Sequence, residues 1–352
     1  MQTRAASTYN AIGKIFAAPD FEGNPLKMEY DRMERKTAPE SAAAGGLSEE
    51  ERGRLVSLIR RSSRPLEPIP PVRGELPADW EQTVLRPGSI RAVLFDLYGT
   101  LFVSAAGDIA SGGGKTEDGA AAEMSAYFRA AVNARHAKAR AAGVKWPEVR
   151  VEEIWRGYAG SVLKEAAASA LGENSSAKAG SMERSREIAL RYEFAVNPAY
   201  PMPGALDTIR ALRGQGLTLG IISNAQFFSP LLFDAFFDAA PAALGFDPEL
   251  LIYSFEEGEA KPSPVLFVRA VDALAKRGAG PGETLYVGND MRNDIAGAAA
   301  AGMKTCLFAG DRRSLRLRPD ECGQLRPDMA VRSLAAIVNY LRPAHAEQEA
   351  GR

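Results

Sequence analysis

The chain has 352 residues, a length that suggests about two domains, and its 46% hydrophobic and 25% charged residues are typical of a globular protein. Its 43 Lys and Arg residues nearly balance its 44 Asp and Glu residues, so charge gives no reason to expect nucleic acid or an anionic membrane as a partner. No apolar run approaches the roughly 18 residues of a membrane span, and two histidines leave little room for a histidine triad or a histidine-rich metal site.

The two cysteines, Cys306 and Cys322, have no CxxC neighbour. This spacing predicts neither a disulfide framework nor a zinc site. Unpaired thiols are typical of a reducing compartment, so the sequence favours the cytoplasm. The sequence does not determine an oligomeric state.

The N-terminal part, residues 1–88, is predicted to be a mostly flexible extension with one clear helix. A short helix is also expected near Tyr9–Ala17. The clear helix covers 48–63, where Ser48 and Glu51 form a capping-box pattern before an apolar face. The segment after this helix contains four prolines within seven residues, which enforce an extended linker. We expect this helix to dock weakly on the rest of the chain.

A buried strand is predicted at 90–102, where the run IRAVLFDLYGTLF is rich in apolar and β-branched residues and turns at Gly99. The block that follows, 104–200, has apolar residues at helical spacing and is introduced by the glycine-rich segment SGGGKTEDG. Its predicted helices are Met124–Ala142, Val151–Ala170 and Arg184–Ala195.

Strand and helix patterns alternate after Pro203. The predicted strands are Leu217–Ser223, Leu251–Ser254, Thr284–Gly288 and Met303–Phe308, and the predicted helices are Ala205–Arg213, Leu231–Phe237, Pro264–Lys276, Asp294–Ala301 and Val331–Leu341. This alternation predicts an α/β fold with a parallel sheet covered by helices on both faces. In such sheets the functional site lies beyond the carboxyl ends of the strands.

Polar residues follow the first two core strands at those ends. Asp96 ends the first strand beside the turn at Gly99, where a carboxylate can face a ligand while backbone N–H groups bind an anion. Ser223 and Asn224 end the next strand and can hydrogen-bond an oxyanion. Alone, Asp96 is equally compatible with an ordinary cap or turn, and for Ser223 and Asn224 alone a strand-terminating turn is the favoured interpretation.

Two further segments complete the set. Lys261 follows the third strand next to a proline and is a candidate for neutralising charge, although a single lysine is usually a surface residue. Asp290 and Asp294 straddle a junction between a loop and a helix, where a water-rich magnesium site can form. The alternative is that Asp290 or Asn293 caps that helix.

Together and in this order, the four segments resemble the motifs of the haloacid dehalogenase superfamily: FDLYGTL motif I, IISN motif II, the lysine of AKPSP motif III and GNDMRND motif IV. The resemblance covers about residues 90–310. It implies a doubly wound parallel sheet, a Rossmannoid core, at 89–103 and 201–345. It also implies an α-helical cap domain at 104–200, which we expect to close over the site with hinges at SGGGKTEDG and near Pro198–Pro203.

The resemblance also implies a mechanism. Asp96 would be the nucleophile and would form a covalent aspartyl intermediate that water hydrolyses. The implied substrate contacts are Gly99, Thr100, Ser223, Asn224 and Lys261. Mg²⁺ would be held by Asp96, the backbone carbonyl of Tyr98 and Asp290, with Asp294 supporting the metal through water or orienting Lys261.

The chain departs from the phosphatases of this family at Tyr98, where they usually carry a second aspartate that serves as acid and base. A phenol with an ordinary pKa near 10 is a poor substitute. Tyrosine here resembles the 2-haloacid dehalogenases, whose halide leaving group needs no proton and which use no metal. The acids of motif IV favour a phosphatase, although Asn289 disturbs the usual order there.

We therefore predict a magnesium-dependent phosphatase of a small anionic metabolite. A metal-free dehalogenase-like hydrolase is the first alternative, and a catalytically weak binding or regulatory protein on the same fold is the second. The arginine cluster at Arg312–Arg318 is interpreted as a solvated loop, with contact to an acidic substrate or partner as the alternative.

Overall fold

The computed structural model describes residues 46–71, 74–77, 80, 85, 88–107, 120–161 and 181–342. The helix expected at Tyr9–Ala17 and the glycine-rich segment lie outside these residues. The described part contains a six-stranded sheet in the order β5-β4-β1-β6-β7-β8, in which every neighbouring pair is parallel. Within those ranges, no helix combines the length and apolar character needed to cross a membrane.

The strands of this sheet are β1 (Ala92–Phe95), β4 (Thr218–Ser223), β5 (Phe246–Tyr253), β6 (Thr284–Gly288), β7 (Lys304–Phe308) and β8 (Met329–Val331). The central strand β1 is buried on both faces. Its side chains alternate, so Val93 and Phe95 pack into one apolar cluster and Ala92 and Leu94 into another. This double burial explains the nearly continuous apolar sequence of the strand.

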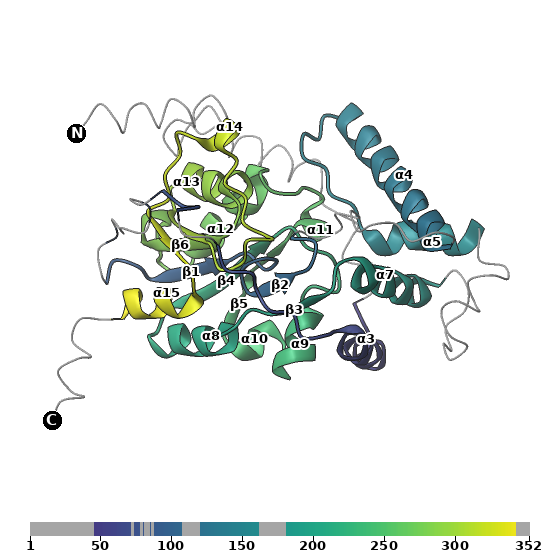
Figure 1. Cartoon of the computed structure of the whole chain (residues 1–352), viewed down its shortest axis with the longest axis horizontal. Coiled ribbons are helices and arrows are strands. Elements are labelled where there is room, and N and C mark those ends of the chain that lie inside the picture. Colours follow the sequence, from purple (N-terminus) through teal and green to yellow (C-terminus); the bar gives the residue numbers. More distant parts are fainter. Residues whose placement is uncertain are drawn as a thin grey trace.

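Helices cover both faces of the sheet, with α12 and α13 on one side and α8, α10 and α15 on the other (Figure 1). The helices of the core are α8 (Ala205–Gly214), α9 (Leu231–Phe237), α10 (Pro241–Leu244), α11 (Ser254–Glu257), α12 (Pro264–Ala275), α13 (Gly297–Ala300), α14 (Pro319–Cys322) and α15 (Leu334–Leu341). A 3₁₀ turn, η2 (Pro281–Glu283), leads into β6. The doubly wound parallel architecture predicted from the sequence is confirmed.

Two predicted elements at the edges of the sheet were wrong in kind or extent. The segment predicted as one helix at Val331–Leu341 contains the end of β8, which pairs with β7, and then α15. The predicted strand Leu251–Ser254 is the second half of the longer β5. The first half was missed because it contains Pro248, which an edge strand tolerates since one side of its backbone has no partner strand.

Two elements next to the site also differ from expectation. The helix predicted at Asp294–Ala301 begins earlier, as a π-helical turn, η3 (Met291–Ala296), that continues into α13. The chain after β1 turns at Gly99, which has a φ of 83°, and then forms β2 (Phe102–Ser104), paired antiparallel with β3 (Ala199–Pro201). This two-stranded ribbon carries the chain out of the core and back.

The chain between β2 and β3 forms α4 (Ala120–Ala141), α5 (Val151–Ser161) and α7 (Met182–Val196), here called the helical insertion. The predicted helix at Val151–Ala170 is described only as far as Ser161. Stacked aromatic rings hold the insertion together: the centroid of Trp155 lies 5.5 Å from that of Phe128 and 4.9 Å from that of Tyr192. The insertion lies beside the core rather than on either face of the sheet (Figure 1).

A backbone connection joins the helical insertion to the core. The N–H of Ala260 donates to the carbonyl of Trp146 at 2.8 Å, and the N–H of Glu148 donates to the carbonyl of Gly258 at 2.9 Å. These bonds, here called the 146–260 connection, are formed by the segment between α4 and α5. They place the insertion directly beside the residue that precedes Lys261.

The N-terminal helix α3 (Glu49–Ser62) packs against both the insertion and the core. Its N-cap is as predicted, since the Ser48 side chain accepts a hydrogen bond from the Glu51 N–H at 3.1 Å. The other half of the predicted capping box is replaced by an ion pair, because both carboxylate oxygens of Glu51 accept from Arg186 of α7 at 3.1 Å. On the core side, Arg52 pairs with Asp234 of α9 at 2.6 Å.

We expect Glu51→Ala to lower the free energy of unfolding by about 2 kcal/mol or more, because it breaks a largely buried ion pair between α3 and α7. Urea denaturation measures this loss. Glu50→Ala on the same helix is the matched control. It removes the exposed pair with Arg54 and should cost less than about 1 kcal/mol. Equal effects of the two changes would show that α3 does not fasten the insertion.

Candidate active site

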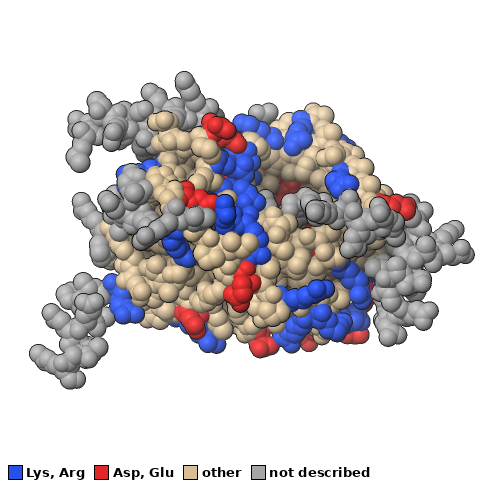
Figure 2. Space-filling view, viewed as in Figure 1, with Lys and Arg blue, Asp and Glu red and all other residues tan. Residues whose placement is uncertain are grey.

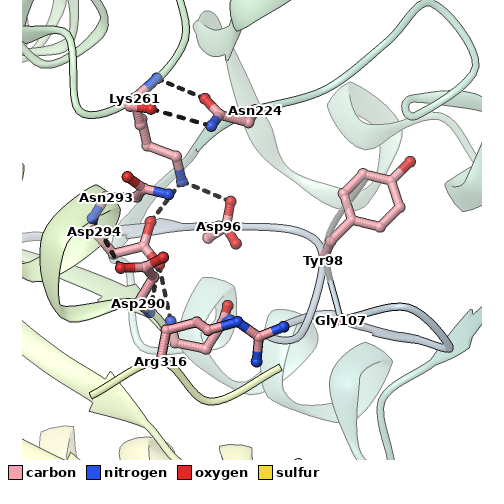
Figure 3. Close-up of a pocket in the computed structure, with 10 residues that line it drawn as sticks. Asp96, Tyr98, Gly107, Asn224, Lys261, Asp290, Asn293, Asp294 and Arg316 are labelled. Carbon is pink, nitrogen blue, oxygen red and sulfur yellow. Dashed lines mark hydrogen bonds and ion pairs between the residues drawn. The ribbon is translucent and has the colours of Figure 1, made fainter. Parts of the chain in front are cut away.

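Six of the predicted site residues meet in one pocket at the carboxyl ends of the central strands. Asp96 follows β1, Asn224 follows β4 and Asp290 follows β6, while Lys261 arrives from the loop after α11. They surround a pocket that opens to solvent. The residues lining it are Asp96, Tyr98, Gly107, Asn224, Lys261, Asn289, Asp290, Asn293, Asp294 and Arg316 (Figure 3).

Lys261 is the centre of a buried ion cluster. Its Nζ donates to Asp96 Oδ1 at 2.7 Å and to Asp294 Oδ1 at 2.6 Å. It also contacts the hydroxyl of Tyr286 at 2.9 Å and the carbonyl of Ile222 at 3.2 Å. The ammonium therefore joins two carboxylates that would otherwise repel each other, and it holds one oxygen of Asp96 in place.

Burial and charge perturb this cluster strongly. Burial raises the pKa of Asp294 to about 7, and the neighbouring negative charges of Asp96 and Asp290 add to the rise although Lys261 opposes it. Burial likewise raises the pKa of Asp96, with Lys261 and a hydrogen bond from Ser223 acting in the opposite direction. Burial alone would lower the pKa of Lys261, but Asp294 and Asp96 together raise it, so the lysine stays charged.

Asn224 positions this lysine through its backbone. The Asn224 Oδ1 accepts the N–H of Lys261 at 2.6 Å, and its Nδ2 donates to the Lys261 carbonyl at 3.3 Å. Asn224 was also predicted to bind substrate. To do so, its side chain would have to contact the substrate while keeping these two hydrogen bonds to Lys261. In this arrangement its carboxamide fixes the loop that carries Lys261.

Three predicted substrate contacts lie behind the pocket wall rather than in it. Gly99, Thr100 and Ser223 are all buried and do not line the pocket. The Thr100 hydroxyl donates to Asn289 Oδ1 at 3.1 Å. Gly99 is packed so closely that a Cβ atom there would lie 2.9 Å from the Asn289 side chain. These residues support the wall, and their contact with substrate stays a prediction.

Asp290 lines the pocket but is held by an arginine. Its Oδ1 accepts from Arg318 Nε at 2.7 Å, and its Oδ2 accepts from Arg318 Nη2 at 2.6 Å. The same Oδ1 caps the π-helical turn by accepting the N–H groups of Arg292 and Asn293. Planar, two-point contact of this kind is the strongest that an arginine makes with a carboxylate.

Both carboxylate oxygens of Asp294 are already hydrogen-bonded. Its Oδ1 accepts from Lys261 and, at 3.1 Å, from the Tyr286 hydroxyl. Its Oδ2 accepts the N–H groups of Asn289 and Asp290, both at 2.9 Å. The Tyr286 hydroxyl has one proton and also lies 2.7 Å from the Ile222 carbonyl, so the Lys261 ammonium and the two backbone N–H groups are the firm donors to this carboxylate. Of the two roles expected for Asp294, the geometry favours orienting Lys261 over binding a metal.

Figure 3 shows the ring of Tyr98 directed away from Asp96 and Lys261. Its hydroxyl shares a 2.8 Å hydrogen bond with Ser229 Oγ. Burial, relieved only in part by that bond, raises the pKa of Tyr98 well above its ordinary value. The side chain therefore does not replace the acid that phosphatases of the family carry at this position.

The structure adds pocket residues that sequence reasoning missed or undervalued. Arg316 lines the pocket, and Arg318 does not line it but holds Asp290. Both come from the arginine cluster, here called the arginine loop (Asp311–Arg318), which was interpreted as a solvated surface segment. The loop runs beside motif IV, with the N–H of Arg316 donating to the Asn289 carbonyl at 3.0 Å. The signal in the sequence was the density of arginines soon after the end of a core strand.

The chain was compared with known proteins. A family model described as haloacid dehalogenase-like hydrolase matches residues 90–302. A ribulose-1,5-bisphosphate 5-phosphatase of Halopiger xanaduensis is 33% identical over 109 residues, which is 30% of this chain and 41% of that protein. A phosphoglycolate phosphatase of Escherichia coli K12 is 33% identical over 121 residues, 33% of this chain and 44% of that protein.

The chain therefore spans less than half the length of these curated relatives. Among solved structures, a defluorinating L-2-haloacid dehalogenase is 19% identical and has a TM-score of 0.45. That alignment covers 73% of this chain and 99% of the dehalogenase.

Proposed function

The chain belongs to the haloacid dehalogenase-like hydrolases, and from this premise we propose that it hydrolyses small phosphate esters through an aspartyl-phosphate at Asp96. The observation that carries the proposal is the cluster in which Lys261 holds Asp96 at 2.7 Å inside an open pocket. Both curated relatives described above are named as phosphatases, which supports the same reaction type.

In the proposed first step, a carboxylate oxygen of Asp96 attacks the phosphorus atom, and the bond to the leaving alcohol oxygen breaks. Lys261 keeps the attacking carboxylate aligned and offsets negative charge on the transferring group. In the second step, water attacks the phosphorus atom of the intermediate, inorganic phosphate leaves and the Asp96 carboxylate is restored. The leaving alkoxide takes its proton from solvent water and not from Tyr98, whose hydroxyl faces Ser229.

We propose that Asp96, Asp290 and the backbone carbonyl of Tyr98 would hold Mg²⁺, although the described residues contain no cluster of three acidic, histidine or cysteine side chains around one point. Asp96 and Asp290 both line the pocket, beside Tyr98 with its backbone carbonyl, and two carboxylates with water suffice for this ion. Bound there, Mg²⁺ would reduce the repulsion between an anionic nucleophile and an anionic substrate. Arg318 already forms two hydrogen bonds to Asp290, so we propose that the ion competes with this guanidinium.

We expect Arg318→Gln to tighten Mg²⁺ binding by about 10-fold or more, because it frees Asp290 from a charge-assisted contact. Isothermal titration with MgCl₂ measures the dissociation constant without any substrate. Arg292→Gln is the matched control, since its side chain pairs with Glu321 at 3.0 Å instead of Asp290. An unchanged dissociation constant in Arg318→Gln would argue against Asp290 as a metal ligand.

A dehalogenase-like reaction is the second candidate, and the orientation of Tyr98 favours it. A halide leaving group needs no proton, so this reaction would not be slowed by the lack of a general acid at Tyr98. Asp96 would then displace the halide from carbon and form an ester, which water would hydrolyse at the carboxyl carbon of Asp96. The same nucleophile serves both reactions, but water attacks a different atom in each.

A single turnover in H₂¹⁸O separates the two reactions. Hydrolysis at phosphorus places the label in released phosphate and leaves Asp96 unlabelled, which is the result we expect with a reactive phosphate ester. Hydrolysis at the carboxyl carbon places the label in Asp96, which mass spectrometry of the peptide detects after turnover of 2-chloropropionate. If neither compound is turned over and a metabolite still raises the melting temperature, the chain is a binding protein.

We also propose a cytoplasmic location. Cys306 and Cys322 are both buried and unpaired, which supports a reducing compartment.

Helices α4, α5 and α7 are proposed to act as the cap, since they join the core through the β2–β3 ribbon and the 146–260 connection.

A further inference from the structure

Arg316 differs from the other members of the arginine loop in having no acidic partner among the described residues. Arg312 pairs with Glu75, Arg313 with Asp311 and Arg318 with Asp290. Arg316 donates instead to backbone carbonyls, with Nη1 at 2.6 Å from the Arg313 oxygen and 3.2 Å from the Leu315 oxygen. Its positive charge is therefore available to a ligand.

The position of Arg316 is fixed from both sides. Its N–H donates to the Asn289 carbonyl at 3.0 Å, and its carbonyl accepts the N–H of Met291 at 2.9 Å. These bonds attach it to the loop that carries Asp290. At its far end the guanidinium lies over Gly107, where a Cβ atom would come within 2.6 Å of Nη2. The side chain is thus held in the pocket wall by its surroundings.

The guanidinium faces the same pocket as the nucleophile but belongs to a separate set of contacts. Figure 3 shows Arg316 extending beneath Asp96 toward Gly107, and all three residues line the cavity. Lys261 is already bound to Asp96 and Asp294, on the other side of Asp96. Figure 2 shows basic side chains gathered in a band down the middle of the viewed face. The pocket thus offers two cationic positions.

We propose that Arg316 binds a second anionic group of the substrate, a carboxylate or a phosphate, while the phosphate ester that reacts lies at Asp96 and Lys261. This inference rests on the proposed phosphatase function and names its substrate class. The substrate is a small phosphate monoester whose organic part is itself negatively charged. A guanidinium suits this task because its fork matches a carboxylate or phosphate at two points.

The test compares two esters that differ mainly in the second charge: 3-phosphoglycerate, which carries a carboxylate, and glycerol 3-phosphate, which carries a hydroxyl instead. The wild-type protein should have the higher kcat/KM for 3-phosphoglycerate. Arg316→Gln should lower that kcat/KM by about 10- to 100-fold, the loss expected for a charge-assisted contact. The same change should alter the value for glycerol 3-phosphate by less than about 3-fold.

Arg312→Gln is the control in the same loop, because Arg312 pairs with Glu75 and does not line the pocket. It should leave both substrates unchanged, and thermal melting checks that each variant is folded. Equal losses for both esters in Arg316→Gln would place the arginine on the reacting phosphate and overturn the proposal. No loss for either ester would overturn it as well.

Failure of the proposed function gives a different result, namely no phosphate release from either ester by the wild-type protein. Titration calorimetry with 3-phosphoglycerate then tests Arg316 on its own. Weaker binding in Arg316→Gln than in the wild-type and Arg312→Gln proteins supports an anion subsite without phosphatase activity. Equal binding in all three proteins overturns the subsite.

Discussion

Replacement of Asp96 by asparagine should reduce turnover by about 10³-fold or more and leave the fold intact. An amide lacks the anionic oxygen that attacks the substrate, and loss of a nucleophile is among the most damaging changes to an enzyme. The fold should survive because the carbonyl oxygen of the introduced amide can still accept a hydrogen bond from Lys261. Burial disfavours the charge of Asp96, so the melting temperature should stay the same or rise.

The measurement is phosphate release at saturating substrate together with thermal melting of each protein. Asp320→Asn is the control, since Asp320 is exposed on α14 and is not part of the pocket lining. It should leave both quantities unchanged. Asp96→Asn with at least a tenth of wild-type turnover would show that another group is the nucleophile.

Replacement of Lys261 by methionine should lower the free energy of unfolding by about 3–5 kcal/mol at pH 8, because two buried carboxylates lose the cation between them. Urea denaturation measures the loss. The exposed Lys276→Met is the control and should cost less than about 1 kcal/mol. Turnover should also fall by about 100-fold or more, since Lys261 both aligns the nucleophile and offsets charge.

The loss in Lys261→Met should depend on pH. The pKa of Asp294 is already raised to about 7 in the wild-type protein, and removal of the lysine raises it further. A raised pKa means that the folded state binds the carboxyl proton more tightly than the unfolded state does. The free energy of unfolding therefore falls as pH rises from the ordinary carboxyl pKa to the raised one. The difference in free energy of unfolding between Lys261→Met and the wild-type protein should be largest at pH 8 and should become smaller toward pH 5.

A double variant separates structure from chemistry. Adding Asp294→Asn to Lys261→Met removes one of the two uncompensated charges and should recover part of the lost stability. It should not recover turnover, because the cation beside Asp96 is still missing. Recovery of turnover in the double variant would mean that Lys261 acts only by neutralising Asp294.

The sequence was sufficient to place Asp96 and Lys261 because local patterns determine where they lie. Asp96 directly follows an apolar strand, and parallel strands bring their carboxyl ends to one edge. The lysine follows a strand in the same way, with a short helix between. The alternation of strands and helices likewise predicted the doubly wound sheet that the structure has.

What could not be predicted depends on partners distant in sequence. The Tyr98 hydroxyl is directed by Ser229, 131 residues away, and nothing near Tyr98 indicates that contact. Asp290 is engaged by Arg318 from a loop 28 residues later, where charge density alone had suggested a solvated segment. Side-chain direction and pairing between loops follow from the packed fold, so local patterns do not specify them.

The 146–260 connection has a consequence for how the protein can open. Ala260, whose N–H is bound by Trp146, immediately precedes the lysine that aligns the nucleophile. We propose that the helical insertion acts as a lid over the site. Because the insertion is hydrogen-bonded to the core beside Lys261 as well as joined to it by the β2–β3 ribbon, its movement would strain or break those bonds. Under this proposal, opening the site for a ligand would also displace the lysine, and closure would restore its position.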